Sequence, residues 1–289
     1  MDQLTGQMAG ICLARKKGSV VGPVRDMRQL SAAQLADLRS APVCALDCEG
    51  VGLSRAGPIS IVSLATETTC FLFDVLASQR TPGMVTLLKV LLADPGWIKV
   101  IHDSEMDVDA LHHQLNITVM NVRDTQAWDQ VLTGHRSNLN NTLVRYGCLP
   151  NGERDRDLYT TKPAIWAIRP IKQRLIDYAS RDAQSLLQLR EQQRAKAAET
   201  PGAEVRCVEA SRQAADFFKK FMTTTKISNM GYFIGPEGTN MARLAAQVPG
   251  CHYQRADPRC CLYGDDNLLV YADDEEQLTK AVCATAPYI

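Results

Sequence analysis

The stretch Val43-Cys44-Ala45-Leu46-Asp47-Cys48-Glu49-Gly50 is an apolar run that ends in an Asp-x-Glu-Gly pattern. Successive side chains of a strand point to opposite faces, so Asp47 and Glu49 share one face while Leu46 and Cys48 point into a core. Two neighbouring carboxylates repel each other at a half-buried position unless a cation lies between them, and their hard oxygen atoms suit Mg²⁺ or Mn²⁺ rather than Zn²⁺. An isolated pattern of this kind is more often a strand that runs into an acidic turn. The prediction of a metal site therefore depends on further carboxylates that join the pair.

The composition is typical of a globular protein. The 289 residues include 32 Lys and Arg against 32 Asp and Glu, so the net charge gives no evidence for a nucleic-acid partner. No apolar run reaches the length of a membrane span, and the N-terminal region lacks the pattern of a signal peptide. The ten cysteines are scattered without a Cys-x-x-Cys pair, which indicates reduced thiols. We expect an intracellular protein, of the cytoplasm or nucleus, with no membrane partner.

Apolar periodicity and turn signals predict strands first and then an α/β alternation around one mixed sheet. The predicted elements are a helix capped at Ser31, antiparallel strands over 43–47, 59–65 and 70–76, a helix over 84–92 and a buried strand over 98–101. The expected domains are an N-terminal extension with a short helix (1–40), an α/β domain (41–198), a helical linker (199–221) and a small α+β domain (222–289).

A cluster of acids follows the strand predicted over 98–101. Asp103, Glu105 and Asp109 have the pattern of a solvated helix face. Asp107 instead shares a helical stripe with Leu111 at i+4, which predicts a buried position near the carboxyl end of the preceding strand. Open α/β sheets place their sites at this end of the strands.

A second helix carries polar residues on its apolar stripe. Apolar residues recur at Leu175, Ala179 and Ala183, and both Tyr178 and Asp182 fall on the same side, one turn apart. An Asp on the buried side of a helix costs both helix propensity and desolvation. Taken alone, a Tyr packed with its hydroxyl in water and an Asp bonded to a buried donor explain this pattern.

In their order, these patterns resemble the DEDD superfamily of 3′–5′ exonucleases, in its Tyr-bearing branch, and particularly the ribonuclease D-like group with its Exd1-like relatives. The resemblance covers about 41–193 and rests on five blocks: Leu46-Asp47-Cys48-Glu49, His102 with Asp107 five residues later, Asp124-Thr125-Gln126, Trp166-x-x-Arg169-Pro170 and Tyr178-Ala179-x-x-Asp182. It implies a ribonuclease H-like fold, in which helices flank both sides of a central mixed sheet. The run 151–164 departs from the family pattern.

The resemblance implies that four acids hold two Mg²⁺ or Mn²⁺ ions roughly 4 Å apart: Asp47, Glu49, Asp107 and Asp182. It also implies that Tyr178 orients the attacking water, because a phenol with an ordinary pKa near 10 is a poor base. The candidate substrate contacts are Gly50, for close approach of the terminal nucleotide, His102, which a core position explains as well, and Arg169, in a basic stretch with Lys162 and Lys172.

The C-terminal region contains Gly235-Pro236-Glu237-Gly238 between an apolar approach and a predicted helix. This G-x-x-G pattern resembles the KH domain, whose loop grips a single-stranded nucleic-acid backbone. Strands predicted over 251–255, 259–263 and 267–271 and a helix over 274–285 favour that fold. The region 222–289 has 5 Lys and Arg against 8 Asp and Glu, a net charge of −3, which is unfavourable for phosphate binding. A degenerate module that packs on the nuclease or binds protein is the alternative.

The sequence therefore predicts a metal-dependent 3′–5′ exonuclease. We expect it to act on single-stranded 3′ ends, of RNA in preference to DNA, and to release nucleoside 5′-monophosphates. One alternative is an Exd1-like adaptor that binds RNA without cutting it, although all four acids and the Tyr are retained. A second alternative is a DNA-repair exonuclease, since no residue that reads a 2′-hydroxyl is identifiable.

Overall fold

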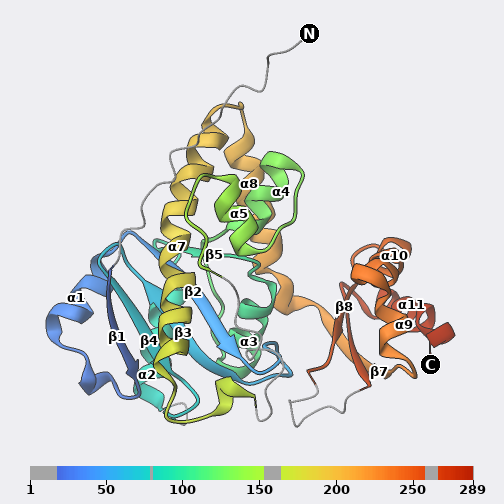
Figure 1. The fold of residues 1–289 in the computed structure, drawn as a ribbon, viewed down its shortest axis with the longest axis horizontal. Coiled ribbons are helices and arrows are strands. Elements are labelled where there is room, and N and C mark those ends of the chain that lie inside the picture. Colours follow the sequence, from blue (N-terminus) through green and yellow to red (C-terminus); the bar gives the residue numbers. More distant parts are fainter. Residues whose placement is uncertain (1–17, 79–80, 153–163, 258–265, 289) are drawn as a thin grey trace.

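The computed structural model describes residues 18–78, 81–152, 164–257 and 266–288, which form a large α/β unit and a small C-terminal α+β unit (Figure 1). The strands and α-helices are β1 (Ser19–Val24), α1 (Ala32–Ser40), β2 (Val43–Gly50), β3 (Ile59–Ala65), β4 (Thr69–Asp74), α2 (Pro82–Leu92), β5 (Ile98–Ile101), α3 (Glu105–Leu115), β6 (Val122–Asp124), α4 (Thr125–Thr133), α5 (Leu139–Arg145), α7 (Gln173–Ala198), α8 (Ala203–Ala215), β7 (Phe221–Lys226), α9 (Met230–Ile234), α10 (Thr239–Gln247), β8 (His252–Arg255), β9 (Asn267–Ala272) and α11 (Glu275–Ala284). Short 3₁₀ turns include η2 (Ile165–Ala167), η3 (Phe217–Lys219) and η4 (Pro236–Gly238).

The large unit is built on a six-stranded mixed sheet with the order β1-β4-β3-β2-β5-β6. Strands β2, β3 and β4 form the expected antiparallel meander, with Asp47 opposite Ser63 and Glu49 opposite Ile61. Strands β5 and β6 continue the sheet in parallel to β2. The predicted ribonuclease H-like architecture, a mixed sheet flanked by helices, is confirmed.

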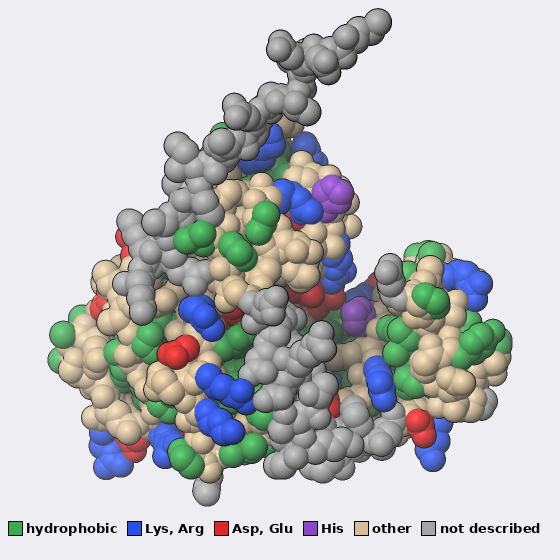
Figure 2. Space-filling model, viewed as in Figure 1, with side chains coloured by type: hydrophobic (Ala, Val, Ile, Leu, Met, Phe, Trp, Pro, Cys, Tyr) green, Lys and Arg blue, Asp and Glu red, His purple; other side chains and the backbone are tan. Residues whose placement is uncertain are grey.

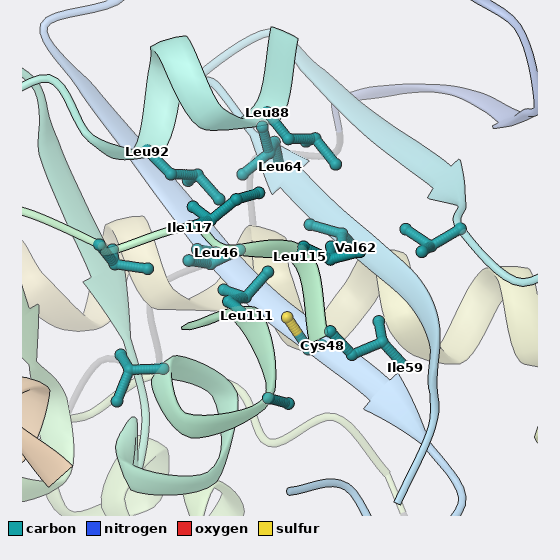
Figure 3. Packing of buried hydrophobic residues seen from close by; sticks show 14 of the residues in the cluster. Leu46, Cys48, Ile59, Val62, Leu64, Leu88, Leu92, Leu111, Leu115 and Ile117 are labelled. Carbon is teal, nitrogen blue, oxygen red and sulfur yellow. The ribbon is translucent and has the colours of Figure 1, made fainter. Parts of the chain in front are cut away.

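Helices cover both faces of this sheet, and β2 distributes its side chains between them. Leu46 and Cys48 pack with residues of α2 and α3, among them Leu111 (Figure 3). On the opposite face, Ala45 packs in a cluster with residues of α7, among them Ala183. The alternation predicted for this strand is therefore confirmed, and Asp47 and Glu49 share the α7 face of the sheet.

The large unit begins before the boundary predicted at residue 41. Strand β1 pairs in parallel with β4, with Ser19 opposite Thr69, and so forms one edge of the sheet. Helix α1 begins after Ser31, whose hydroxyl accepts a hydrogen bond from the backbone N–H of Gln34, as predicted for an N-cap. The sequence hides β1 because this edge strand, in which Gly22 and Pro23 interrupt the valines and Val24 alone is buried, lacks an apolar run. Residues 19–40 are therefore part of the domain and not an extension.

The segment predicted as a helical linker is largely packed on the same domain. Helix α8 contacts α4, and Cys207 is buried in a cluster with Trp128. The hydroxyl of Ser211 accepts hydrogen bonds from the Trp128 indole and from the backbone N–H of Asp124. The helix ends at Ala215, and β7 begins at Phe221, so the linker predicted as helical over 199–221 is an α-helix only over Ala203–Ala215.

The C-terminal unit has an antiparallel sheet of order β7-β9-β8 and three helices, which in Figure 1 lie together at one side of the large sheet. Along the chain the order is strand, helix, G-x-x-G turn, helix, strand, strand and helix. The strand predicted over 259–263 lies outside the described residues. The KH-like identity of this unit therefore stays a prediction. In the part of the chain that the structure describes, no helix is both long and apolar enough to cross a bilayer.

The two units meet at a buried ion pair that the sequence did not indicate. Asp109, expected on a solvated face, is fully buried and accepts hydrogen bonds from the backbone N–H and the guanidinium of Arg55. Arg55 also donates to the carbonyl oxygens of Phe218 and Lys220, and its guanidinium lies 5.4 Å from the ring centre of Tyr271. The prediction for Asp109 failed because its partner lies 54 positions earlier, in the β2–β3 loop.

We expect Arg55→Ala to lower the free energy of unfolding by about 3–5 kcal/mol, because the substitution leaves the Asp109 charge buried without its partner. Chemical denaturation of the full chain measures the effect. Arg28→Ala serves as the matched control, since Arg28 pairs with Asp26 on the surface. A change in Arg55→Ala as small as that in the control would contradict a structural role for the pair.

Candidate active site

After Ala45, β2 is no longer paired with β5, so another part of the chain can bond to this edge of the strand. The parallel pairing with β5 covers Val43 to Ala45, whereas β2 continues to Gly50. Here α3 takes the place of the neighbouring strand, because the backbone N–H of Cys48 donates a 2.9 Å hydrogen bond to Oδ1 of Asp107. The carboxylate of Asp107 therefore lies at the segment of β2 that carries Asp47 and Glu49, at the carboxyl end of β5, as predicted.

Burial controls the ionisation of Asp107. Its side chain is 7% exposed, and this burial raises the pKa of the carboxyl group from 3.8 to about 7, although the Cys48 N–H opposes the shift. The negative charge of Asp103 raises the pKa of Asp107 further. An ionised Asp107 is therefore costly in the protein alone, and a bound cation would offset that cost.

Helix α7 places Tyr178 and Asp182 over the same part of β2. Its first turns pack in a cluster with Val51, and its middle turns pack in a cluster with Ala45, so the helix runs antiparallel to β2. Tyr178 and Asp182 lie between these two groups of contacts, at the level of Asp47 and Glu49. Asp182 is 8% exposed and Tyr178 is half-buried, so the predicted buried stripe is confirmed.

Two asparagines that the sequence analysis missed contact this group. Asn151 is 8% exposed, and its side-chain amide donates a 2.7 Å hydrogen bond to Oδ1 of Asp182. Asn140, at the start of α5, accepts a 2.8 Å hydrogen bond from the backbone N–H of Asn151. A small cleft is lined by Leu139, Asn140, Asn151, Gly152, Tyr178 and Asp182. The Pro-Asn-Gly sequence signals only a turn, so the spacing gives no indication of this contact.

The structure thus brings the four acids to one part of the molecule from β2, α3 and α7. Their hard oxygen atoms and the costly burial of Asp107 fit a divalent cation such as Mg²⁺ or Mn²⁺. As they are placed, however, the described His, Cys, Asp and Glu residues form no group of three or more that could hold a metal ion. Ion binding therefore requires these carboxylates to adjust.

Both ring nitrogens of His102 have partners within the protein. Its Nε2 contacts the carbonyl oxygen of Ser137 at 3.1 Å, and its Nδ1 contacts the Thr125 hydroxyl at 2.8 Å. A carbonyl oxygen only accepts, so Nε2 carries the proton in the neutral ring, while the single hydrogen of the Thr125 hydroxyl is within reach of both Nδ1 and the carbonyl oxygen of Ile101, 3.1 Å away. Desolvation lowers the pKa of His102, which favours this neutral form. These contacts agree with the core interpretation, and a substrate contact of His102 stays a prediction.

Gly50 has a structural reason to lack a side chain, and its expected substrate contact stays a prediction. A Cβ atom at this position would lie 2.4 Å from the carbonyl oxygen of Pro58, closer than any real contact. The pairing of β2 with β3 shifts register between Glu49 and Gly50. The missing side chain therefore accommodates the protein's own backbone.

Arg169 is held inside the protein. Its guanidinium donates to both carboxylate oxygens of the buried Asp74, at 2.6 to 3.0 Å, and to Ser60 Oγ at 2.7 Å. It also donates to the carbonyl oxygens of Trp166 and Ile168. These bonds fix the turn η2 before α7, so the expected phosphate contact is corrected. Lys172 is exposed, and Lys162 lies outside the described residues.

The G-x-x-G turn has a defined backbone. Gly235 and Gly238 have φ angles of +70° and +78°, which favour glycine. A Cβ at Gly235 would lie 2.8 Å from the side chain of Asn240, which donates to the carbonyl oxygen of Tyr232 at 2.7 Å. Pro236 is exposed, and the side chain of Glu237 is outside the structural description. Nucleic-acid binding by this turn stays a prediction.

A larger cleft of about 560 Å³ lies beside the acids, between the large and small units. Glu105 and Arg136 line it on one side and Lys220 and Asp273 on the other. Figure 2 shows this recess, with acidic and histidine side chains gathered within it.

We expect Asp107→Asn to stabilise the metal-free protein relative to wild type as the pH rises. Because the pKa of Asp107 is about 7 in the folded protein against 3.8 for the free group, the folded state holds a proton that the unfolded chain has lost. The wild type therefore loses stability between pH 4 and 8, on the order of a few kcal/mol. Denaturation of both proteins in EDTA at several pH values measures the difference. A difference that is independent of pH would contradict the buried, protonated carboxyl group.

Known proteins are similar to this chain in sequence and in fold. The sequence model of the 3′–5′ exonuclease family matches residues 24–196. The Exosome complex component 10 homolog of Drosophila melanogaster is 28% identical over 176 residues, which are 61% of this chain and 18% of that protein. The piRNA biogenesis protein EXD1 of Homo sapiens is 28% identical over 182 residues, which are 58% of this chain and 35% of that protein. The chain thus spans about a fifth to a third of the length of these curated relatives.

Among solved structures, the crystal structure of Trypanosoma brucei RNase D in complex with RNA U12 has a TM-score of 0.57 and 25% sequence identity, and the alignment covers 71% of this chain and 70% of that chain. The residues matched by the family model include β2, α3 and the part of α7 that carries Tyr178 and Asp182. They make up more than half of the sequence. The chain belongs to the 3′–5′ exonuclease family.

Proposed function

We propose that this protein is a divalent-metal-dependent 3′–5′ exonuclease that removes nucleotides from single-stranded RNA as 5′-monophosphates. The observation that carries the proposal is the convergence of three elements: Asp107 of α3 bonds to β2 between Asp47 and Glu49, and Asp182 of α7 lies over the same face. A buried group of acids at the end of parallel strands suits phosphodiester hydrolysis with divalent ions.

Each side chain has a role in this proposal. Asp47, Glu49, Asp107 and Asp182 would hold Mg²⁺ or Mn²⁺, which when bound neutralises phosphate charge and activates water. Tyr178 lies one helical turn before Asp182, and its ring centre is 6.3 Å from that of Trp166. Packing against Trp166 limits the motion of the Tyr178 ring, which helps its hydroxyl to orient water toward the phosphate.

The preference for RNA is supported by the comparisons. RNase D of Trypanosoma brucei was solved with RNA U12, and its identity to this chain is 25%. The human relative is described as a piRNA biogenesis protein. We extend this preference to the present chain, together with an intracellular location and a KH-like role for the C-terminal unit in holding the strand. The net charge of −3 over 222–289 weighs against strong phosphate binding by that unit.

RNA binding without cleavage is the second candidate. A specific feature favours it: no group of three or more described His, Cys, Asp or Glu residues is arranged to hold a metal ion. A protein whose carboxylates keep this arrangement would bind a strand and leave it intact.

We expect Asp182→Asn to reduce cleavage of a 5′-labelled single-stranded RNA by at least about 1,000-fold, because it removes a charged ligand. The assay includes the matched DNA strand and Mg²⁺, Mn²⁺ or EDTA. Asp177→Asn is the control, since Asp177 is exposed on the same helix and binds Gln173.

Wild-type shortening from the 3′ end that stops in EDTA supports the enzyme. Retained RNA binding without shortening under any metal would support the adaptor instead, and preferential shortening of DNA would overturn the RNA preference.

We expect Tyr178→Phe to lower kcat by about 10- to 100-fold with little change in KM or in Mn²⁺ affinity, because the phenyl ring keeps the contact with Trp166 and loses only the hydroxyl. Steady-state kinetics on a short RNA, with Mn²⁺ affinity measured separately, test this role. An unchanged kcat would show that the hydroxyl does not take part in the reaction.

A further inference from the structure

We infer that Asn151, anchored by Asn140, is a positioning residue for the carboxylate of Asp182, and that its side-chain amide is required for tight divalent-ion binding. The inference deepens the proposed function and rests on it. It begins with the 2.7 Å bond from Nδ2 of Asn151 to Oδ1 of Asp182, between two side chains that are each 8% exposed. An ionised carboxylate only accepts hydrogen bonds, so the amide nitrogen must face it, and the orientation of the Asn151 side chain is settled by its partner.

Asn151 is itself held from two directions. Its backbone N–H donates to Oδ1 of Asn140 at 2.8 Å, and the amide of Asn140 donates to the carbonyl oxygen of Gly152 at 2.8 Å. The amide of Asn151 also reaches Ser185 Oγ at 3.2 Å, and that hydroxyl donates to the carbonyl oxygen of Asp182. The amide that bonds Asp182 is therefore fixed at its backbone and at its tip.

The anchor belongs to a rigid part of the fold. Helix α5, which carries Asn140, is capped by Asn138, and its Leu139 and Leu143 pack in the same cluster as Ala183 of α7. The two helices thus hold the Asn140–Asn151 pair and Asp182 in one packed unit. A carboxylate with one oxygen fixed in this way loses little rotational freedom when it binds an ion, and such supporting hydrogen bonds commonly contribute 10- to 100-fold to metal affinity.

Asn151→Leu and Asn151→Ala test the inference, because both remove the amide and the first nearly keeps the side-chain volume. We expect the Mn²⁺ dissociation constant of the full chain, measured by electron paramagnetic resonance of free Mn²⁺, to rise 10- to 100-fold. RNA affinity in EDTA should stay within threefold of wild type, and kcat at fixed Mn²⁺ should fall while KM for RNA does not. Asn140→Ala should show the same effects to a smaller degree. Asn141→Ala, an exposed neighbour on α5, should match wild type.

The outcomes separate this inference from the proposed function. A Mn²⁺ affinity within threefold of wild type in both Asn151 variants overturns the positioning role. A loss of Mn²⁺ affinity matched by an equal loss of RNA binding and by a lower melting temperature in EDTA shows a merely structural role and also overturns it. If the wild type itself binds no Mn²⁺ and cuts no RNA, the proposed function fails and this inference fails with it.

Discussion

The hydrogen bond from the Cys48 N–H to Asp107 is the interaction on which the site depends. A strand inside a sheet must satisfy its backbone N–H groups, and β2 continues five residues past the end of its pairing with β5 at Ala45. The carboxylate of α3 accepts one of these N–H groups in place of a neighbouring strand. The same bond that completes the sheet therefore brings a third acid between the two acids of β2. This one hydrogen bond therefore satisfies a backbone N–H group of β2 and also places a third acidic side chain beside Asp47 and Glu49.

The sheet also separates the side chains that pack in the core from the acidic side chains of the candidate site. Because side chains alternate along β2, Leu46 and Cys48 enter the core beneath α2 and α3, while Asp47 and Glu49 face α7. Helix α7 crosses this face antiparallel to β2 and adds Asp182 with little need for loops. Rigid elements thus supply every acid, which is the condition for a precise site. The loop that carries Asn151 contributes indirectly, through the hydrogen bond from Asn151 to Asp182.

The sequence was informative where local periodicity determines burial. The stripes containing Asp107 and Asp182 follow from helix geometry, and the structure buries both residues as predicted. The sequence was uninformative about residues whose partners are distant in the chain. Asp74 binds Arg169 across 95 positions, and Pro58 excludes a side chain at Gly50, so Arg169 and Gly50 have structural roles that their motifs did not indicate. Asn151 escaped notice for the same reason, because its importance comes from a helix 31 positions later. Tertiary partners, which no single-sequence pattern records, decide these roles.

The partners of the buried acids distinguish scaffold from site. Asp109, Asp129 and Asp74 are fully buried, and each bonds to an arginine, respectively Arg55, Arg145 and Arg169. Such pairs neutralise charge permanently. For Asp107 the largest influences on the pKa are burial, the uncharged N–H of Cys48 and the negative charge of Asp103, with no cation among them. Three buried aspartates thus have an arginine partner, whereas Asp124 and Asp107 accept hydrogen bonds from uncharged donors. In the proposed enzyme, a bound divalent ion would supply compensating charge for Asp107, and its affinity would draw on the desolvation cost that the folded protein has already met.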